Sequence, residues 1–176
     1  MTNAHHGTSP DVQLRPWSRD DFWVLGRTNA PEMTEHLGGP ETEAQLVARH
    51  QRYLRIDGDG GRMYTIRLSP GGEAAGSIGF WGRTWQGEDV YETGWGVLPE
   101  FQGRGLAVAA ARAVMREAAR SGDRARLHAF PSVDHAASNA VCRKAGFTLL
   151  GACDFEYPKG TFIQSNDWVV ELAAGA

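Results

Sequence analysis

A turn with two glycines, followed by the start of a long helical pattern, carries the clearest chemical signal in this sequence. Glycine has no Cβ, so Gly103 and Gly105 allow backbone N–H groups to approach a ligand closely. The first N–H groups of a helix have no intrahelical partner and lie at the positive end of the helix dipole. The pattern therefore predicts an anion cradle that suits a pyrophosphate. The whole run reads Val97-Leu98-Pro99-Glu100-Phe101-Gln102-Gly103-Arg104-Gly105-Leu106-Ala107.

Three known kinds of phosphate-binding loop could explain this pattern. A dinucleotide-binding fingerprint, as in an oxidoreductase, needs a third glycine, and Val108 stands at that position. A P-loop needs Gly-Lys-Ser or Gly-Lys-Thr, and neither occurs in the chain. The remaining pattern, Gln/Arg-x-x-Gly-x-Gly/Ala, is met by Gln102, Gly105 and Ala107.

Two segments in the right order resemble the motifs of one known family. The run from Gly96 to Ala107 resembles the cofactor motif of the GNAT superfamily of acetyl-CoA-dependent N-acetyltransferases. The run from Ala137 to Phe147 is similar to that family's later helix and its closing Gly-Phe. The resemblance extends from Val12 to Leu172. Its opening Leu14-Arg15-Pro16-Trp17 and its loop Leu37-Gly38-Gly39-Pro40 are similar to the branch that acetylates the N-termini of ribosomal proteins.

The resemblance implies acetyl-CoA as cosubstrate and a primary amine as acceptor. It also implies that the pantetheine arm of coenzyme A lies beside the strand at 90–98 and pairs with its backbone. Gly94 and Gly96 in this strand favour a bulge or a close backbone approach, with room for an aromatic side chain as the alternative. The cofactor-binding residues implied are Trp95, Gly96, Val97, Gln102, Gly103, Arg104, Gly105, Leu106, Ala107, Val108, His135, Ser138 and Asn139.

Glu92 is the candidate general base. An amine acceptor arrives mostly as an ammonium, so it must lose a proton before it attacks a thioester. Glu92 shares a strand face with Gly94 and Gly96 if side chains alternate, and burial would raise its pKa toward a useful value. A salt-bridged or solvated carboxylate is the alternative. The backbone N–H of Val97 is the candidate donor to the oxyanion of the tetrahedral intermediate.

The sequence departs from the family pattern at two positions. Cys142 stands where many members carry a tyrosine, five residues before the Phe of Gly-Phe, and His135 stands where an asparagine is common. The Cys142 thiol is a candidate acid for the leaving thiolate, although a small buried hydrophobe is the commoner role of cysteine. These departures keep open a second function, a non-catalytic acyl-CoA-binding sensor or interaction module on the same fold.

The elements that must position these residues follow from periodicity and from glycine and proline signals. Their order predicts a mixed α/β (α+β) fold. The resemblance implies the GNAT fold, with a central mixed, mostly antiparallel sheet of about 6–7 strands, splayed in the middle and flanked by about four helices. Residues 1–10 are expected to form a flexible tail and residues 11–176 a single N-acetyltransferase domain. Strands are expected at 12–15, 63–68, 74–81, 90–98, 125–130, 148–155 and 164–172, helices at 19–29, 43–56, 104–121 and 136–144, and a polar loop at 82–89.

Acceptor contacts are expected in the segments 31–39, 82–89 and 154–165. Trp81, Trp85, Tyr91 and Trp95 cluster near that side in the sequence, with core packing as the default role of aromatics. Arg112, Arg116 and Arg120 recur at helical spacing and predict a solvated face, whereas Arg104 and Arg143 are better placed for phosphates.

The composition of the chain argues against several other classes of protein. A net charge of −3 does not suggest a general binder of nucleic acid or of anionic membranes. No segment reaches the roughly 18 apolar residues of a membrane span, and the first ten residues lack an apolar signal core. Two cysteines fit a reducing cytoplasm, and the six histidines show no metal-ligand spacing, so no metal is expected. The resemblance is compatible with a homodimer.

Overall fold

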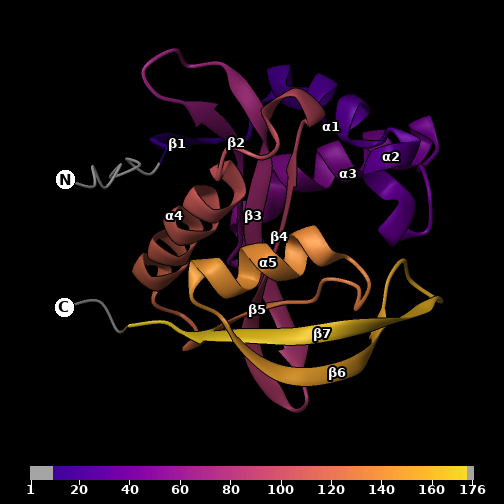
Figure 1. The fold of residues 1–176 in the computed structure, drawn as a ribbon, viewed down its shortest axis with the longest axis vertical. Coiled ribbons are helices and arrows are strands. Elements are labelled where there is room, and N and C mark those ends of the chain that lie inside the picture. Colours follow the sequence, from indigo (N-terminus) through magenta and orange to yellow (C-terminus); the bar gives the residue numbers. More distant parts are fainter. Residues whose placement is uncertain (1–9, 174–176) are drawn as a thin grey trace, which may run out of the picture.

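Seven strands form one sheet in the order β1-β2-β3-β4-β5-β7-β6. The computed structural model describes residues 10–173 (Figure 1), so the expected tail lies outside the described residues except for Pro10. The strands are β1 (Val12–Pro16), β2 (Arg62–Leu68), β3 (Ala74–Trp85), β4 (Glu88–Val97), β5 (Arg126–Ala129), β6 (Thr148–Glu156) and β7 (Phe162–Glu171). The helices are α1 (Phe22–Thr28), α2 (Pro31–Thr34), α3 (Glu43–Arg55), α4 (Leu106–Ser121) and α5 (Ala136–Ala145).

One strand pair divides the sheet into two parts. All neighbouring strands are antiparallel except β4 and β5, which run parallel. These two strands pair only over Tyr91–Thr93 and Leu127–Ala129, and β4 then continues to Val97 without a partner in β5. Figure 1 shows β6 and β7 running across the lower part of β3 and β4, away from the far end of β4. The expected mixed, mostly antiparallel sheet, splayed in the middle, is confirmed.

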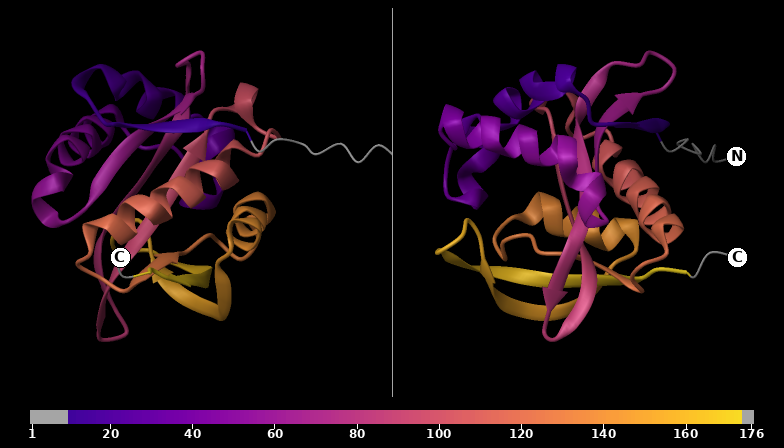
Figure 2. Two further views of the ribbon diagram at one scale, coloured as in Figure 1. Left: turned by 90° about the vertical axis from the view of Figure 1, so that its left-hand side faces the viewer. Right: turned by 180° about the vertical axis from the view of Figure 1, so that it is seen from behind.

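Helices cover both faces of the sheet. On one face, α4 packs against β1, β3, β4 and α5, and the buried core there includes Phe80, Tyr91, Leu127 and Val114. On the other face, α1 and α3 enclose a smaller core around Trp17, Val24 and Leu46. The left view of Figure 2 shows α4 and α5 on the side of the sheet opposite to α1 and α3.

Local signals set most helix ends as expected. Thr42 caps α3 by accepting a hydrogen bond from the N–H of Gln45, whose side chain bonds back to the N–H of Thr42. Gly122 ends α4 at φ +75°, and Gly146 ends α5 at φ +105°, a left-handed conformation that favours glycine. Helix α4 begins at Leu106 rather than at the expected position 104, because Gly103 and Gly105 have positive φ angles.

Two other expectations need correction. The polar loop expected over 82–89 is wrong: β3 extends to Trp85 and β4 starts at Glu88. A two-residue turn, Gln86 at φ 49° and Gly87 at φ 82°, joins the strands in a tight hairpin. The helix expected over 19–29 is a 3-10 turn followed by α1, and the single-turn helix α2 adds to the expected helices within residues 10–173.

Candidate active site

The free end of β4 offers backbone groups to a ligand. In an antiparallel ladder, successive peptides point to opposite edges of the strand. The N–H of Leu98 donates to the carbonyl oxygen of Ala75 at 2.8 Å, so the peptide groups of Gly96, two residues earlier, also face β3. Those of Trp95 and Val97 face the gap beyond the end of β5. Buried backbone groups need partners, so this gap suits a ligand that carries amides.

One of these groups already has a partner. The side chain of Gln102 donates to the carbonyl oxygen of Val97 at 2.9 Å. The N–H of Val97 and the peptide groups of Trp95 therefore remain for a ligand, whereas Gly96 provides space and no hydrogen bond. This differs from the expectation that all three residues pair with pantetheine.

The glycines of β4 make room for side chains and do not form a bulge. The register between β3 and β4 is continuous from Gly76↔Val97 to Trp85↔Glu88. A Cβ atom at Gly94 would lie 3.2 Å from the ring of Trp81, and one at Gly96 would lie 3.5 Å from the methyl group of Thr28. The alternative interpretation, room for an aromatic neighbour, therefore holds for Gly94.

The start of α4 has the backbone geometry that the expected cradle requires. Gly103 and Gly105 have φ angles of 76° and 75°, and Gly105 is the N-cap residue, with no side chain to bond the helix end. The N–H of Ala109 donates to the carbonyl oxygen of Gly105 at 3.1 Å, so the three earlier N–H groups of the helix lie before this first bond. They belong to Leu106, Ala107 and Val108. A helix of 16 residues adds its dipole to these donors.

A cavity of about 350 Å³ lies beside this cradle. Arg112 reaches it and donates from Nη2 to the carbonyl oxygen of Lys144 at 2.8 Å. Arg112 is exposed, as the sequence predicts, and in addition lines this cavity. Its position one helical turn after Val108 was the signal that could have placed it on the cradle side. The cavity is lined by Pro10, Gly105, Val108, Ala109, Arg112 and Lys144.

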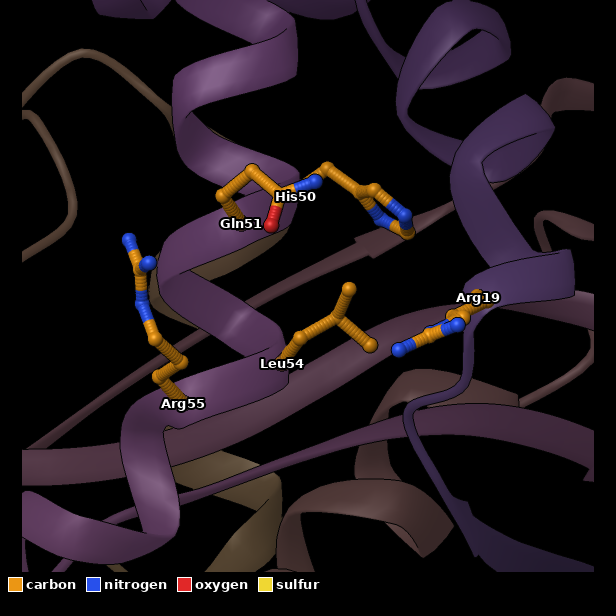
Figure 3. A pocket seen from close by; sticks show the side chains of 5 residues that line it. All are labelled: Arg19, His50, Gln51, Leu54 and Arg55. Carbon is orange, nitrogen blue, oxygen red and sulfur yellow. The ribbon is translucent and has the colours of Figure 1, made fainter.

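A larger cavity, of about 620 Å³, lies elsewhere, along α3. Figure 3 shows its side chains, which come from α3 and from the 3-10 turn at Arg19. They are Arg19, His50, Gln51, Leu54 and Arg55, none of which belongs to β4, α4 or α5. Size alone therefore does not identify the chemical site.

Glu92 lies on the face of β4 opposite to the α4 core. Its neighbours Tyr91 and Thr93 alternate with it, and the Tyr91 ring is fully buried against α4 and Phe80. The Glu92 side chain is only 12% exposed, and its Oε2 atom accepts a hydrogen bond from Nη1 of Arg83 at 2.8 Å. Burial raises the pKa of Glu92 above its ordinary value, and the charge of Arg83 opposes that rise. Glu92 is therefore a buried carboxylate held by one cation.

Arg83 is itself fixed by aromatic rings. Its Cζ atom lies 4.4 Å from the ring centre of Phe155, 5.5 Å from that of Trp85 and 5.6 Å from that of Phe130. No sequence pattern selects Arg83, because it is a single arginine in an expected polar loop. Its role depends on the hairpin, which places it beside Glu92.

The three segments expected to contact the acceptor come together in this region. The rings of Trp85 and Phe155 lie 6.2 Å apart, which joins segments 82–89 and 154–165. Gly38, in segment 31–39, faces Pro158. Of the four aromatics expected here, Trp81 lies across the β3–β4 pair from Glu92 and Trp85 contacts Phe155, whereas Tyr91 and Trp95 pack toward the opposite core.

The family model for the acetyltransferase (GNAT) domain matches residues 11–148. The chain belongs to the GNAT acetyltransferase family. A search of curated protein sequences gave no match.

Solved structures with this fold cover nearly the whole chain of the GNAT protein. Aminoglycoside acetyltransferase AAC(6')-Ib in complex with coenzyme A matches with a TM-score of 0.74 and 19% identity, over 93% of this chain and 96% of its own. RimL, a ribosomal L7/L12 α-N-protein acetyltransferase in complex with coenzyme A, matches with a TM-score of 0.72 and 22% identity, over 96% of this chain and 97% of its own. Spermidine N-acetyltransferase from Vibrio cholerae, with coenzyme A and spermine, matches with a TM-score of 0.74 and 13% identity, over 93% of this chain and 96% of its own. At these identities the likeness establishes a shared fold.

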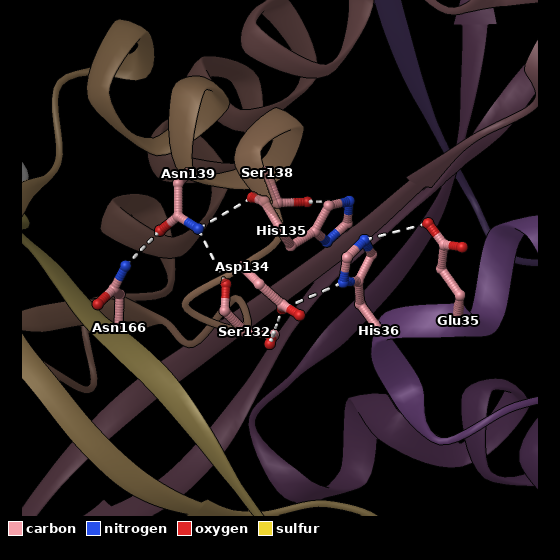
Figure 4. A network of polar contacts seen from close by, with 8 residues as sticks. All are labelled: Glu35, His36, Ser132, Asp134, His135, Ser138, Asn139 and Asn166. Atoms are coloured by element: carbon pink, nitrogen blue, oxygen red, sulfur yellow. Dashed lines mark hydrogen bonds and ion pairs between the residues drawn. The ribbon is translucent and has the colours of Figure 1, made fainter.

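The cofactor residues predicted in and before helix α5 of this GNAT protein differ in their hydrogen bonding, as Figure 4 shows. The amide of Asn139 donates to the carbonyl oxygens of Ser132 and His135, each at 2.9 Å. Its oxygen accepts from Asn166 and from the indole of Trp168, each at 2.8 Å. Every hydrogen-bonding position of this buried amide is used inside the protein. The side chain of Asn139 is therefore structural, which corrects its expected contact with coenzyme A.

His135 and Ser138 lie at the start of α5. The ring of His135 stacks on that of His36 with centres 4.2 Å apart, and burial lowers the pKa of His135. Oγ of Ser138 lies 3.5 Å from Nε2 of His135. His36 also contacts Asp134, so the segment after α2 and the start of α5 are joined.

Cys142 is fully buried in the core between α4, α5 and the sheet. Burial raises the pKa of its thiol to about 12. A free thiol of this kind ordinarily has a pKa near 8.5, so Cys142 is a weak proton donor to another thiolate. The packing role that the sequence favoured fits this position.

In residues 10–173, no group of three or more His, Cys, Asp or Glu side chains is arranged to hold a metal ion. None of the helices in the same range is both long and apolar enough to cross a membrane.

Proposed function

We propose that this GNAT protein transfers the acetyl group of acetyl-CoA to a primary amine by direct attack, with Glu92 as the general base. One observation carries the proposal. Unpaired backbone groups at the end of β4 point into the gap beyond β5, and Glu92 lies on the same strand with its side chain away from the α4 core. Residues 11–176 act as one catalytic domain in this proposal.

The backbone holds acetyl-CoA in this scheme. The N–H groups at the start of α4 and in the Gln102–Gly105 turn bind the pyrophosphate, and Arg104 and Arg112 add positive charge. The peptide groups of Trp95 bind the amides of the pantetheine arm. The N–H of Val97 stabilises the oxyanion of the tetrahedral intermediate. The thioester supplies an acyl carbon that an amine can attack.

Glu92 removes the proton that blocks attack. Because Arg83 opposes the effect of burial, the carboxylate is kept available as a proton acceptor in a desolvated position. Cys142 takes no part, because its thiol is buried on the other face of the sheet and is a weak acid. Ser138 and His135, at the start of α5, contact coenzyme A instead.

The similar structures support an amine acceptor. Their names include an aminoglycoside acetyltransferase, an N-terminal protein acetyltransferase and a spermidine acetyltransferase. The direct test is a thiol-release assay with acetyl-CoA and a panel of these three kinds of amine, beside calorimetric titration with acetyl-CoA. Amine-dependent release of free coenzyme A is expected. A well-folded protein that binds no acetyl-CoA contradicts the proposal.

One observation favours a second function. The core position of Cys142 leaves the site without the tyrosine that the family pattern provides there, which suits an acyl-CoA-binding sensor without turnover. Tight binding of acetyl-CoA without thiol release for any amine supports this alternative. Release that depends on one amine class excludes it.

A further inference from the structure

Two buried histidines have opposite hydrogen-bonding environments. Nδ1 of His128 lies 2.6 Å from Oδ1 of Asp167, and both residues are 4% exposed. Nδ1 of His50 instead accepts a hydrogen bond from the indole N–H of Trp17 at 3.0 Å. A carboxylate accepts and an indole only donates, so the partners assign opposite tautomers to the two rings. His128 carries its proton on Nδ1, and neutral His50 carries it on Nε2.

The tautomer of His128 leaves a basic nitrogen. With Nδ1 protonated, Nε2 presents a lone pair, and no side chain among residues 10–173 donates to it within hydrogen-bond distance. The second oxygen of Asp167 accepts the indole N–H of Trp85 at 2.9 Å, so the carboxylate cannot rotate away from His128 without losing that bond. This arrangement fixes an imidazole base by a buried carboxylate.

His128 is the neighbour of Glu92 in the sheet. The two residues are register partners on the parallel strands β4 and β5. Leu127 and Ala129 face the α4 core, so the side chain of His128 lies on the other face, as Glu92 does. Strands in a sheet are about 4.8 Å apart, which brings the two side chains together. A charge on His128 accordingly lowers the pKa of Glu92.

Three other positions in the sheet supply the charged and titratable groups around this pair. Arg83 of β3 bonds to Glu92, and Asp167 of β7 bonds to His128. Cys153 of β6 lies near Asp167 and Arg83, and burial raises the pKa of its thiol to about 11, which keeps it neutral. Glu92 and His128 are therefore the two groups here that are suited to accept protons.

The reaction requires two protons to leave the acceptor nitrogen. A primary ammonium carries three hydrogens and the amide product carries one. One of the two protons ends on the sulfur of coenzyme A as the carbon–sulfur bond breaks, and the other goes to solvent. A single carboxylate would have to release its first proton before it could accept the second.

We propose that His128 is a second proton acceptor beside Glu92 and that Asp167 is its positioning residue. Glu92 takes the proton of the ammonium before attack, and Nε2 of His128 takes the proton that the nitrogen loses when the carbon–nitrogen bond has formed. Asp167 stabilises the resulting imidazolium. This inference rests on the proposed acetyl transfer and adds residues that neither the family motifs nor the sequence indicated.

Asp167→Asn gives a test that depends on the tautomer. The indole of Trp85 can only donate, so the amide must turn its oxygen to Trp85 and its NH2 group to Nδ1 of His128. The proton of His128 then moves to Nε2, and the base is lost. We expect kcat/KM to fall about 100-fold. Adding Trp85→Phe removes the indole N–H and lets the amide turn round. The kcat/KM of the double variant is then expected to be about tenfold or more above that of Asp167→Asn.

His50→Gln is the matched control, because His50 is also buried and bonded through Nδ1 but lies on α3. Its kcat/KM is expected to stay within about twofold of wild type. A double variant Asp167→Asn with Trp85→Phe that is no more active than Asp167→Asn alone overturns the inference. If these variants do not fold, nitrogen-15 NMR of the wild-type protein decides: a proton on Nδ1 of His128 supports the inference and a proton on Nε2 overturns it.

The outcomes separate this inference from the function on which it rests. A wild-type protein that releases no coenzyme A with any amine contradicts the proposed acetyl transfer. An active wild-type protein in which the second substitution gives no recovery contradicts only the role of His128.

Discussion

Arg83 and Glu92 lie on adjacent strands of one hairpin, and Nη1 of Arg83 is 2.8 Å from Oε2 of Glu92. The guanidinium also lies over the ring of Phe155 at 4.4 Å, so an aromatic surface holds the cation in place. The carboxylate is buried, and burial alone would favour its protonated form. Arg83 therefore determines how far Glu92 can serve as a base near neutral pH.

Replacing Arg83 by Met should move the pH dependence of acetyl transfer. Removal of the cation disfavours the carboxylate, so the pKa of Glu92 rises further above its ordinary value. The acid limb of the kcat/KM profile then shifts to higher pH, and activity is lost most at the acid end and recovered toward the alkaline end. Arg83→Lys keeps the charge and should shift the limb less. An unchanged acid limb in Arg83→Met would show that the acid limb does not report the ionisation of Glu92.

Replacing Glu92 by Gln should reduce turnover and leave acetyl-CoA binding almost intact. The amide cannot accept the proton of the ammonium, and the loss of a general base typically costs about 10²- to 10⁴-fold in rate. Steady-state kinetics and calorimetric titration measure the two quantities separately. Asp89→Asn, an exposed change on the same strand, is the control. Equal rates for Glu92→Gln and wild type at every pH would rule out Glu92 as the base.

Replacing Arg112 by Ala should weaken acetyl-CoA binding. Arg112 lines the cavity next to Gly105 and is one of two cationic side chains there, the other being Lys144. Loss of one charge-assisted contact to a phosphate is expected to raise the Kd for acetyl-CoA about 5- to 10-fold, with a smaller effect at high salt. Arg116→Ala is the matched control on the same helix, because Arg116 does not line the cavity. Equal Kd values for both variants would place the phosphates elsewhere.

Replacing Asn139 by Ala should destabilise the fold. The side-chain amide satisfies the indole of Trp168, the amide of Asn166 and two backbone carbonyl groups. Several buried polar groups lose their partner at once, so the free energy of unfolding is expected to fall by about 2–4 kcal/mol. Denaturant unfolding measures this, with Ser138→Ala as the stability control. A Tm and a denaturant midpoint equal to those of the control would mean that water replaces the amide without cost.

Much of the fold was predictable from the sequence. Apolar periodicity, the caps at Thr42 and Gly146, and the glycine turn before α4 are local features, and each produced an element close to its expected position. The sequence predicts a loop at the hairpin tip because its residues are polar. Tertiary contacts stabilise it instead, since the indole of Trp85 bonds to Asp167 and Thr84 bonds to Asp89.

The candidate site was predictable only in part. The sequence predicts the cradle from a motif and Glu92 from its position on a strand, and both remain predictions. Asn139 was assigned to the ligand, although all its bonds are internal, because a motif does not reveal which way a side chain faces. The sequence predicts the exposure of Arg112 correctly, but its helical row does not reveal the cavity beside α4.

The sequence by itself determined the order of the strands and helices, the glycine turn before α4 and the presence of a carboxylate on the strand before it. Only the tertiary structure decided which charges meet. Arg83 and Glu92 are nine residues apart, and His128 and Asp167 are 39 apart. Their contacts depend on strand register and on which face of the sheet each residue occupies. A shift of one residue would turn each side chain to the other face, so this information belongs to the assembled sheet and not to any segment alone.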